Sequence, residues 1–330
     1  MEEAALPGVF PGRSASRNEA SGLTFDVRIE RKTMEMEKEE KESGKKSSKK
    51  VKILATFLIL AGLLVLLYPT ISNLFNQWRA EQLSTVYQEV VKEIPDDHFA
   101  EELEKARKYN EKLTGESVPD VFALREKHDD PLYDSLLNVT GDGMMGEVEI
   151  PAINVKIPVY HYTTDQVLQQ NVGHLAGSSL PIGGKGTHAV LSAHRGLPSA
   201  KLFTDLNLLK KGDLFFLRVL NEFMAYEVDQ MIEVEPTETA SLAIDRDKDL
   251  CTLFTCTPYG VNTQRLLVRG HRVDYTPEEM AKKYEEEKDI RIDKSRLLFH
   301  ILAGTAGAGL GFLPYLMVRK RRKKNEEARP

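Results

Sequence analysis

Two long apolar runs stand out from an otherwise mixed pattern of hydrophobic and polar residues. They cover residues 53–71 and 297–318, so they are nineteen and twenty-two residues long, and neither contains Asp, Glu, Lys or Arg. A helix needs about 20 apolar residues to cross a bilayer. The pattern therefore predicts one transmembrane helix at 53–71 and a second at 297–318.

Each run also has an alternative explanation. The first could be a cleaved signal peptide, but it exceeds the ~7–15 residues of a signal's apolar core and no A-x-A cleavage site follows. The second could be a Gly-rich core helix, because His300 and Pro314 are unfavourable in lipid. The six consecutive basic residues at 319–324 instead favour the end of a membrane span.

The positive charges predict the orientation of the chain. Lysines cluster at residues 45–52 before the first run, and the basic cluster at 319–324 follows the second. The positive-inside rule then places both termini in the cytoplasm and the middle of the chain outside the cell membrane. We expect a disordered cytoplasmic tail at 1–52, because this segment is charged and lacks apolar periodicity, and a basic cytoplasmic tail at 319–330.

The outer part of the chain changes from a helical to a β pattern. Residues 72–94 have helical spacing, and a second helix is predicted from Pro95 to before Gly115, so 72–135 reads as a helical stalk. Short β-type runs then predict a closed barrel or sandwich at 136–275, with a juxtamembrane linker at 276–296. These runs are 146–153, 155–160, 187–194, 213–220, 222–236, 249–256 and 265–273.

Composition excludes several classes of protein. The 45 basic and 50 acidic residues give a net charge of −5, which offers no global argument for nucleic-acid binding. Two cysteines are too few for a disulfide scaffold or a zinc site built mainly of thiolates. No His/Cys pair has the spacing of a metal motif, so we expect no metal.

Cys256 is the candidate nucleophile. It ends an apolar strand and precedes a turn-rich segment, which places a thiol beside a loop. A buried hydrophobe is the commoner role of a free cysteine. Cys251 lies five residues earlier, so we expect it about 16 Å away on the opposite strand face, beyond the reach of a disulfide.

His194 and Arg265 are the candidate partners of that thiol. His194 closes the strand that begins near His188, and Arg265 begins the strand after Cys256. A histidine can move a proton near neutral pH, and a guanidinium can hold a developing oxyanion. Taken singly, each is more often a surface or structural residue.

Three segments together resemble the sortases, the cysteine transpeptidases of Gram-positive surfaces. TLFTCTPYGVNTQRLLVRGHR (252–272) resembles the TLxTC signature and the strand after it, HAVLSAHRGLPSAKLFTDL (188–206) the histidine segment, and GHLAGSSLPIGG (173–184) the stretch before it. The resemblance covers about residues 136–273. The segment after the cysteine and the two apolar runs resemble class C, the pilin-polymerising sortases.

The resemblance implies a fold and a reaction. The fold is mainly β, an eight-stranded sortase-type barrel with N-terminal helices and two flanking transmembrane helices. Cys256 is implied as the nucleophile, His194 as general acid/base and Arg265 as the stabiliser of the oxyanion. The enzyme would cleave an LPxTG-like signal of a pilin precursor between Thr and Gly and join the acyl group to a lysine amine of the next pilin, without cofactor.

Class C sortases carry an Asp-Pro-aromatic lid, and this chain departs from that pattern. Asp120-Val121-Phe122 keeps the acid and the aromatic but lacks the proline, whereas Asp130-Pro131-Leu132 lacks the aromatic. We prefer Asp120 and Phe122 as the lid, because an aromatic can cover the thiol and an acid can pair with Arg265. An ordinary Pro-Asp turn is the alternative.

Two other functions remain open at this point. One is a sortase that attaches proteins to the cell wall; the second apolar run and the candidate lid favour polymerisation over it. The other is a catalytically silent, membrane-anchored scaffold that keeps the barrel, which the intact Cys256, His194 and Arg265 disfavour.

Overall fold

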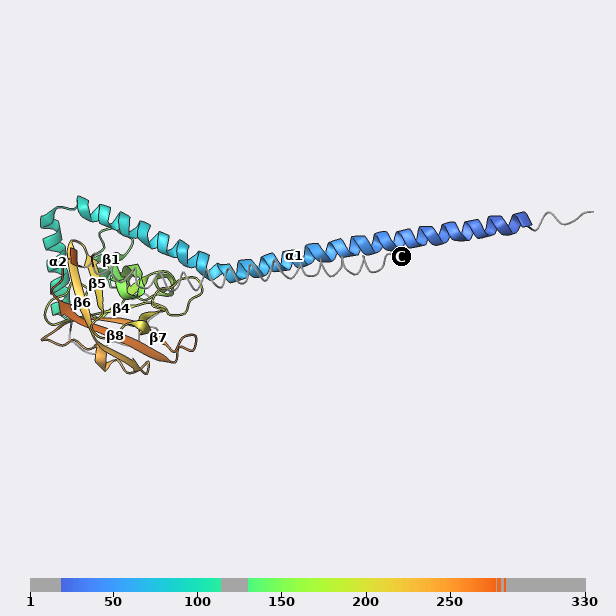
Figure 1. Ribbon diagram of the computed structural model, residues 1–330. Coiled ribbons are helices and arrows are strands. Elements are labelled where there is room, and N and C mark those ends of the chain that lie inside the picture. Colours follow the sequence, from blue (N-terminus) through green and yellow to red (C-terminus); the bar gives the residue numbers. More distant parts are fainter. Residues whose placement is uncertain (1–18, 114–129, 277, 280–281, 283–330) are drawn as a thin grey trace, which may run out of the picture. The chain divides into compact units, whose positions relative to one another are not determined.

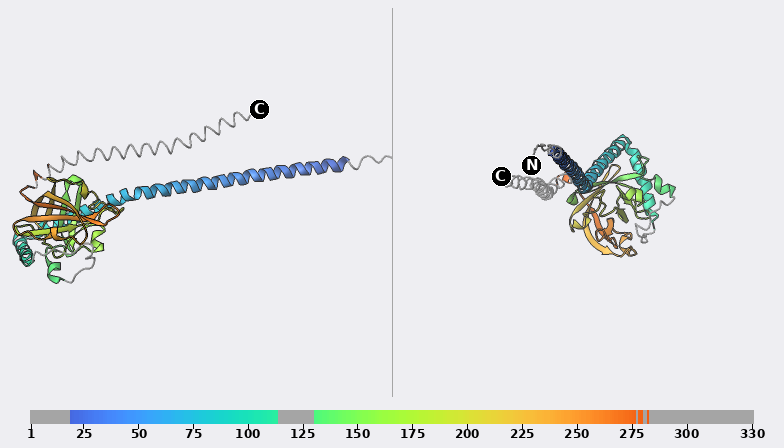
Figure 2. Two further views of the ribbon diagram at one scale, coloured as in Figure 1. Left: turned by 90° about the horizontal axis from the view of Figure 1, so that it is seen from below. Right: turned by 90° about the vertical axis from the view of Figure 1, so that its right-hand side faces the viewer.

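The computed structural model of the chain describes residues 19–113, 130–276, 278–279 and 282. Its chain divides into two compact units, residues 1–67 and 68–330. The second unit holds a barrel with helices against it, shown in Figure 1 and from two further sides in Figure 2. The helices are α1 (Glu19–Glu93), α2 (Asp96–Glu111), α3 (Pro131–Ser135) and α4 (Asp165–Leu168), with short 3-10 turns η1 (Pro151–Ile153), η2 (Leu206–Leu208) and η3 (Ala240–Leu242).

The first apolar run lies inside α1. Within the described residues, one helical stretch, Ile53–Glu93, is long and apolar enough to cross a membrane. Its most apolar 18 residues have a mean hydropathy of 2.3, and none of them is buried. The second predicted span, 297–318, lies outside the described residues. One of the two predicted membrane helices therefore has structural support.

The segment expected to be a disordered tail is helical over part of its length. α1 begins at Glu19, well before the apolar run. Residues 31–52 are rich in Glu and Lys, both of which favour the helix and can pair at i,i+4 spacing. A helix already nucleated in the apolar run also extends at low cost. We expected disorder because this segment lacks apolar periodicity. That periodicity indicates whether a helix packs against other elements, and a helix can form without it.

Eight strands close into a barrel in the order β1-β2-β3-β4-β7-β8-β6-β5. The β2–β3 and β4–β7 pairs are parallel, and the other pairs are antiparallel. This confirms the predicted eight-stranded sortase-type barrel. The strands are β1 (Met144–Ile150), β2 (Val155–His161), β3 (Val172–His174), β4 (Thr187–Ser192), β5 (Leu214–Val219), β6 (Glu222–Val234), β7 (Asp249–Thr257) and β8 (Gln264–Val273).

β3 is the strand that the sequence pattern did not reveal. It has only three residues, all buried. A fully buried strand shows no alternation of polar and apolar positions, and three residues give no periodicity to read. Its place is set by its neighbours, because Gly173 pairs with Ser192 of β4 and Val172 pairs with Val159 of β2.

The described part of the predicted stalk is mainly helical, but it packs on the barrel. Tyr87 of α1 and Phe99, Leu103 and Ala106 of α2 belong to the same buried cluster as the barrel interior. The three residues of α2 lie at helical spacing and form an apolar face that must be covered in water, and the barrel covers it together with Tyr87. Asn110 then fixes the end of α2, because its amide donates to and accepts from the backbone of Leu180 over 3.2 and 2.7 Å.

Candidate active site

Cys256 lies near the end of β7, and only 9% of its surface is exposed. It belongs to a small buried cluster that includes Phe254 and Leu267, whereas Cys251 belongs to the main core. The two thiols therefore lie on opposite faces of β7, as the strand period predicts, and neither forms a disulfide. Burial raises the pKa of the Cys251 thiol well above its usual value, so this cysteine is the inert one.

Arg265 faces Cys256 across the β7–β8 ladder. The two residues are direct partners in the antiparallel register, so their side chains project to the same face. Arg265 is 8% exposed, and its Nη1 donates to the carbonyls of Asn262 and Gln264, each over 3.2 Å. These bonds hold one edge of the guanidinium against the β7–β8 turn.

His194 reaches the same place from the other side of β7. β4 runs parallel to β7 and ends at Ser192, which pairs with Phe254. Beyond the strand, the Ala193 N–H donates to the Phe254 carbonyl over 3.2 Å, and Thr255 Oγ1 donates to the Ala193 carbonyl over 2.7 Å. Continued by two residues, the parallel register that pairs Ser192 with Phe254 aligns His194 with Cys256. His194 is partly buried.

The three predicted site residues thus come from adjacent strands, or from just beyond one of them. β4, β7 and β8 are neighbours in the barrel, and His194, Cys256 and Arg265 lie at the same end of them. His194 is in the loop after β4, two residues past the strand end at Ser192, whereas we predicted that it closes the strand. Such a position gives a side chain access while the strand fixes its origin.

Two loops meet over this end of the barrel. Arg195 Nη1 donates to Thr257 Oγ1 over 3.0 Å, which ties the histidine loop to the residue after Cys256. Thr257 Oγ1 in turn lies 3.2 Å from a carboxylate oxygen of Glu233. A Cβ added to Gly196 would come within 3.1 Å of the Tyr259 ring, so the turn after β7 lies against the histidine loop.

These supporting residues were not predicted from the sequence. Arg195 directly follows His194, and Tyr259 lies three residues after Cys256. Closeness to a candidate site residue in the sequence was the only sign that they could support the site. Tyr259 and Val261 are exposed, by 59% and 65%, at the rim of the site. Exposed apolar side chains beside a reactive group suit contact with an apolar ligand residue.

Other histidines near the barrel are structural. His188, on β4, makes hydrogen bonds to Thr252 Oγ1 and the Ala243 carbonyl over 2.8 and 2.9 Å. His174 is held by Tyr133 Oη and the Ser179 carbonyl. Burial lowers the pKa of His188 and lowers that of His174 to about 4, so both stay neutral at physiological pH.

The described part of the chain contains no group of three or more His, Cys, Asp or Glu side chains arranged to hold a metal ion. The preferred lid residues, Asp120 and Phe122, lie outside the described residues. The alternative tripeptide is described, and it begins α3: Asp130 caps the helix by accepting the N–H of Tyr133 over 3.0 Å, and Pro131 occupies its first turn.

Comparisons with known proteins agree with this geometry. The sortase domain family matches residues 148–273. The solved sortase C-1 of Streptococcus pneumoniae is 42% identical, with 59% of this chain and 100% of that chain covered and a TM-score of 0.55. Sortase C1 of Streptococcus agalactiae is 44% identical over the same shares, with a TM-score of 0.53.

A more distant curated relative is sortase A of Bacillus anthracis, 28% identical over 165 residues, which are 49% of this chain and 77% of that protein. The identity to the solved sortases extends over their whole length and includes the eight-stranded barrel. The chain therefore belongs to the sortase family of cysteine transpeptidases, and its solved streptococcal relatives are class C sortases.

Proposed function

We propose that this chain is a membrane-anchored transpeptidase that cleaves an LPxTG-like sorting signal between Thr and Gly and joins it to a lysine amine of a pilin subunit. One observation carries the proposal: Arg265 is the direct cross-strand partner of Cys256, and the β4–β7 register brings His194 to the other side of the same residue. A thiol, an acid/base and a fixed cation at one barrel end suit acyl transfer.

The first half-reaction makes a thioester. The Cys256 thiolate attacks the Thr carbonyl carbon, and the carbonyl oxygen becomes an oxyanion beside the guanidinium of Arg265. The C–N bond then breaks, and the protonated His194 gives its proton to the leaving Gly amine. The partly buried site strengthens the attraction between guanidinium and oxyanion, because nearby water is limited.

The second half-reaction reverses the proton transfer. A lysine amine of the acceptor attacks the thioester carbon, His194 takes the amine proton, and Cys256 leaves as a thiolate. The products are an isopeptide bond and the original enzyme. This two-step route requires that the first product leaves before the acceptor enters, which is a ping-pong scheme.

Pilin as the substrate class is supported by the solved relatives. A sortase C of S. pneumoniae, 39% identical, is described in connection with pilin substrate specificity, and a 38% identical sortase C1 belongs to a pilus island. Cell-wall anchoring is the second candidate, supported by curated relatives named sortase A. The acceptor distinguishes the two: a pilin lysine for polymerisation, and a peptidoglycan amine for anchoring.

We also propose that Asp120 and Phe122 form the lid and that two spans anchor the enzyme. The lid is supported indirectly, since Asp130 and Pro131 of the competing tripeptide serve as the start of α3. Anchoring is supported by the apolar stretch within α1. Anchored enzyme and anchored precursors would meet in two dimensions, which raises their effective concentration.

The deciding experiment measures the intact mass of the full chain in detergent micelles after incubation with an LPxTG peptide. The parent and an Asp120→Ala, Phe122→Ala form are compared, each with and without Cys256→Ala. We expect a mass gain equal to the peptide acyl fragment, larger in the lid variant and absent with Cys256→Ala. A folded lid variant that gives neither adduct nor cleaved peptide would overturn the proposal.

A further inference from the structure

The loop after His194, residues 195–202, is held from outside the barrel by α1. The side chains of Ser72 and Asn76 both donate to the carbonyl of Ser199, over 2.7 and 2.6 Å. Ser72 is the first residue after the apolar run that ends at position 71. The helix therefore contacts the histidine loop as soon as its apolar run ends.

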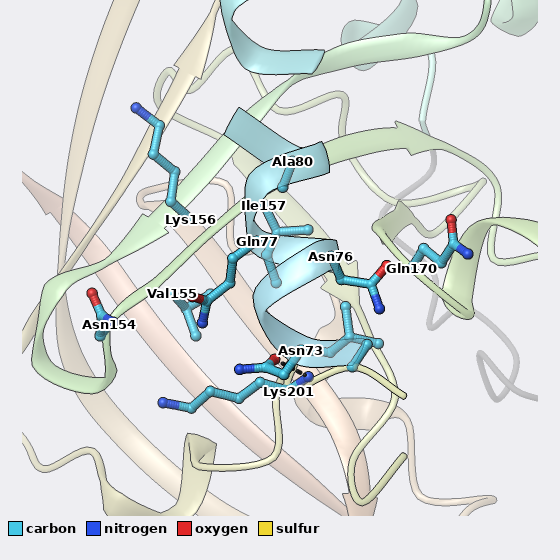
Figure 3. Close-up of a pocket in the computed structure, with 12 residues that line it drawn as sticks. Asn73, Asn76, Gln77, Ala80, Asn154, Val155, Lys156, Ile157, Gln170 and Lys201 are labelled. Atoms are coloured by element: carbon cyan, nitrogen blue, oxygen red, sulfur yellow. Dashed lines mark hydrogen bonds between the residues drawn. The ribbon is translucent and has the colours of Figure 1, made fainter. Parts of the chain in front are cut away.

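A third side chain of α1 holds the same loop. Asn73 Oδ1 accepts the backbone N–H of Lys201 over 2.9 Å, the bond drawn as a dashed line in Figure 3. Ala200 and Leu202, on either side of Lys201, are buried. Positions 72, 73 and 76 fall on one face of a helix with 3.6 residues per turn. We call these three residues the α1 clamp.

The far side of the loop is tied to the active site. The Phe203 N–H donates to the His194 carbonyl over 3.2 Å, which closes the loop at its base. Arg195 Nε donates to the Thr204 carbonyl over 3.1 Å, and its Nη1 reaches Thr257 beside Cys256. Hydrogen bonds therefore hold the middle of the loop to α1 and its base to His194 and Thr257.

The cavity beneath the clamp is too small for a substrate. It measures about 40 Å³ and lies between α1, β2 and the histidine loop (Figure 3). That volume is enough for a few water molecules, each needing about 10–15 Å³, but not for a peptide. Asn73 and Asn76, which line it, instead dock the helix on the histidine loop.

We propose that the α1 clamp positions His194, so that the juxtamembrane part of α1 supports the active site. The inference rests on the proposed role of His194 as the acid/base. Without the clamp, the Ser199 carbonyl and the Lys201 N–H lose their partners, and the loop is free to shift with His194 at its base. Small displacements of a reacting group cost rate steeply, up to about 100-fold for about 1 Å.

A pair of isosteric substitutions tests the clamp. Asn76 acts as a donor to a carbonyl, so Asn76→Asp removes that donor and places a carboxylate against the Ser199 oxygen. Asn73 acts as an acceptor, so Asn73→Asp keeps its bond to Lys201. In the full chain with the loosened lid, we expect Asn76→Asp to slow acylation at saturating peptide about 10-fold, with the half-saturating peptide concentration unchanged, and Asn73→Asp to keep the parental rate.

Gln88→Ala is the matched control for helix docking in general. Gln88 also joins α1 to the barrel, by donating to Glu147 Oε1 over 3.1 Å, but it does not touch the histidine loop. We expect the parental acylation rate in this variant. If Asn76→Asp does not fold, Ser72→Ala replaces it as the test, because it removes the other donor to Ser199, and we expect a loss of a few fold.

The outcomes separate this inference from the proposed function. A folded Asn76→Asp protein with the parental rate would overturn the clamp, and so would a Gln88→Ala or Asn73→Asp protein that loses as much rate. His194→Ala is the reference: full acylation without the imidazole would instead contradict the catalytic role of His194. Loss with His194→Ala but not with Asn76→Asp rejects the clamp alone.

Discussion

The side chains that we interpret as structural are more deeply buried than the candidate nucleophile, Cys256. Cys251 and Cys256 share one strand, yet the first is fully enclosed in the main core and the second lies at the rim of the barrel. His188 and His174 are enclosed and hydrogen-bonded on both ring nitrogens. Residue type alone did not distinguish these roles, because burial depends on which strands become neighbours.

Selective alkylation follows from the two thiol environments. Iodoacetamide reacts with thiolates, and burial raises the pKa of Cys251, which is also inaccessible. We expect the folded full chain to gain one alkyl group, mapped to Cys256 by peptide mass, and the Cys256→Ala protein to gain none. In urea both cysteines should react. Modification of Cys251 in the folded chain at a comparable rate would contradict this assignment.

His174 should make the fold less stable in mild acid. Its pKa falls from an ordinary value of 6.5 to about 4 in the folded chain, because it is buried. Above pH 6.5 His174 is neutral in both the folded and the unfolded chain, so its titration does not change the free energy of unfolding. Between 6.5 and about 4 only the unfolded chain binds the proton, so the free energy of unfolding falls, by about 1.4 kcal/mol per pH unit and about 3 kcal/mol in all.

The His174→Gln protein provides the comparison, since it removes the titrating ring. Urea unfolding of the full chain in detergent, followed by circular dichroism at pH 7 and pH 4.5, gives the pH dependence of each protein. We expect the variant to be less stable at pH 7 but to lose less stability on acidification. An equally steep loss in both proteins would show that His174 does not contribute.

At the scale of elements, α2 and the part of α1 from residue 68 onward belong to the barrel domain. Tyr87 of α1 shows how: its Oη donates to the Met145 carbonyl over 2.9 Å and accepts the Leu220 N–H over 2.8 Å. One buried hydroxyl therefore satisfies backbone groups of β1 and of the β5–β6 turn. In a helix that stood free of the barrel, Tyr87 would be exposed to solvent, whereas here it is fully buried.

Removing that hydroxyl should destabilise the domain. Tyr87→Phe leaves a buried N–H and a buried carbonyl without this partner, which costs about 1–3 kcal/mol. We expect a lower thermal midpoint for the full chain. Tyr160→Phe is the control, because the Tyr160 hydroxyl donates to Asp142 over 3.3 Å at an exposed position, and its loss should change stability by about 0.5 kcal/mol or less. Equal effects of the two variants would contradict the docking role of Tyr87.

At the scale of the whole molecule, we propose that two apolar runs hold the chain in a membrane. Residues 53–71 lie in the apolar stretch of α1, and the run at 297–318 is supported by its sequence alone. A lysine near the centre of a span costs about 2.5–3.5 kcal/mol. Leu60→Lys with Leu64→Lys should therefore disable the first span, and deletion of 297–318 should remove the second.

Carbonate extraction of membranes from cells that express each form gives the test. We expect the parent, the double-lysine form and the deletion form each to stay with the membrane, and the combined form to be released. Release of the double-lysine form, which keeps 297–318, would show that the second run does not span. Retention of the combined form would mean that another part of the chain anchors it.

Much of the fold and of the candidate site could be predicted from the sequence. Seven of the eight strands show as apolar runs between turn residues, because strand and turn preferences are local. The resemblance supplied the eighth strand as a count, but its place at Val172–His174 came only with the structure. The sequence also singled out the candidate site residues Cys256, His194 and Arg265. Each lies at or next to a strand end, within a segment that resembles a sortase motif.

Contacts between residues far apart in the chain became visible only in the folded structure. Asn73 and Lys201 are separated by 128 positions, and Tyr87 and Leu220 by 133. No local pattern marks such pairs, because a helix face shows that it must be covered but not by what. From the sequence came most of the elements, the apolar run and the candidate reactive residues; the closure of the barrel brings together strands that are distant in the chain, because the pairing of strands sets their neighbours.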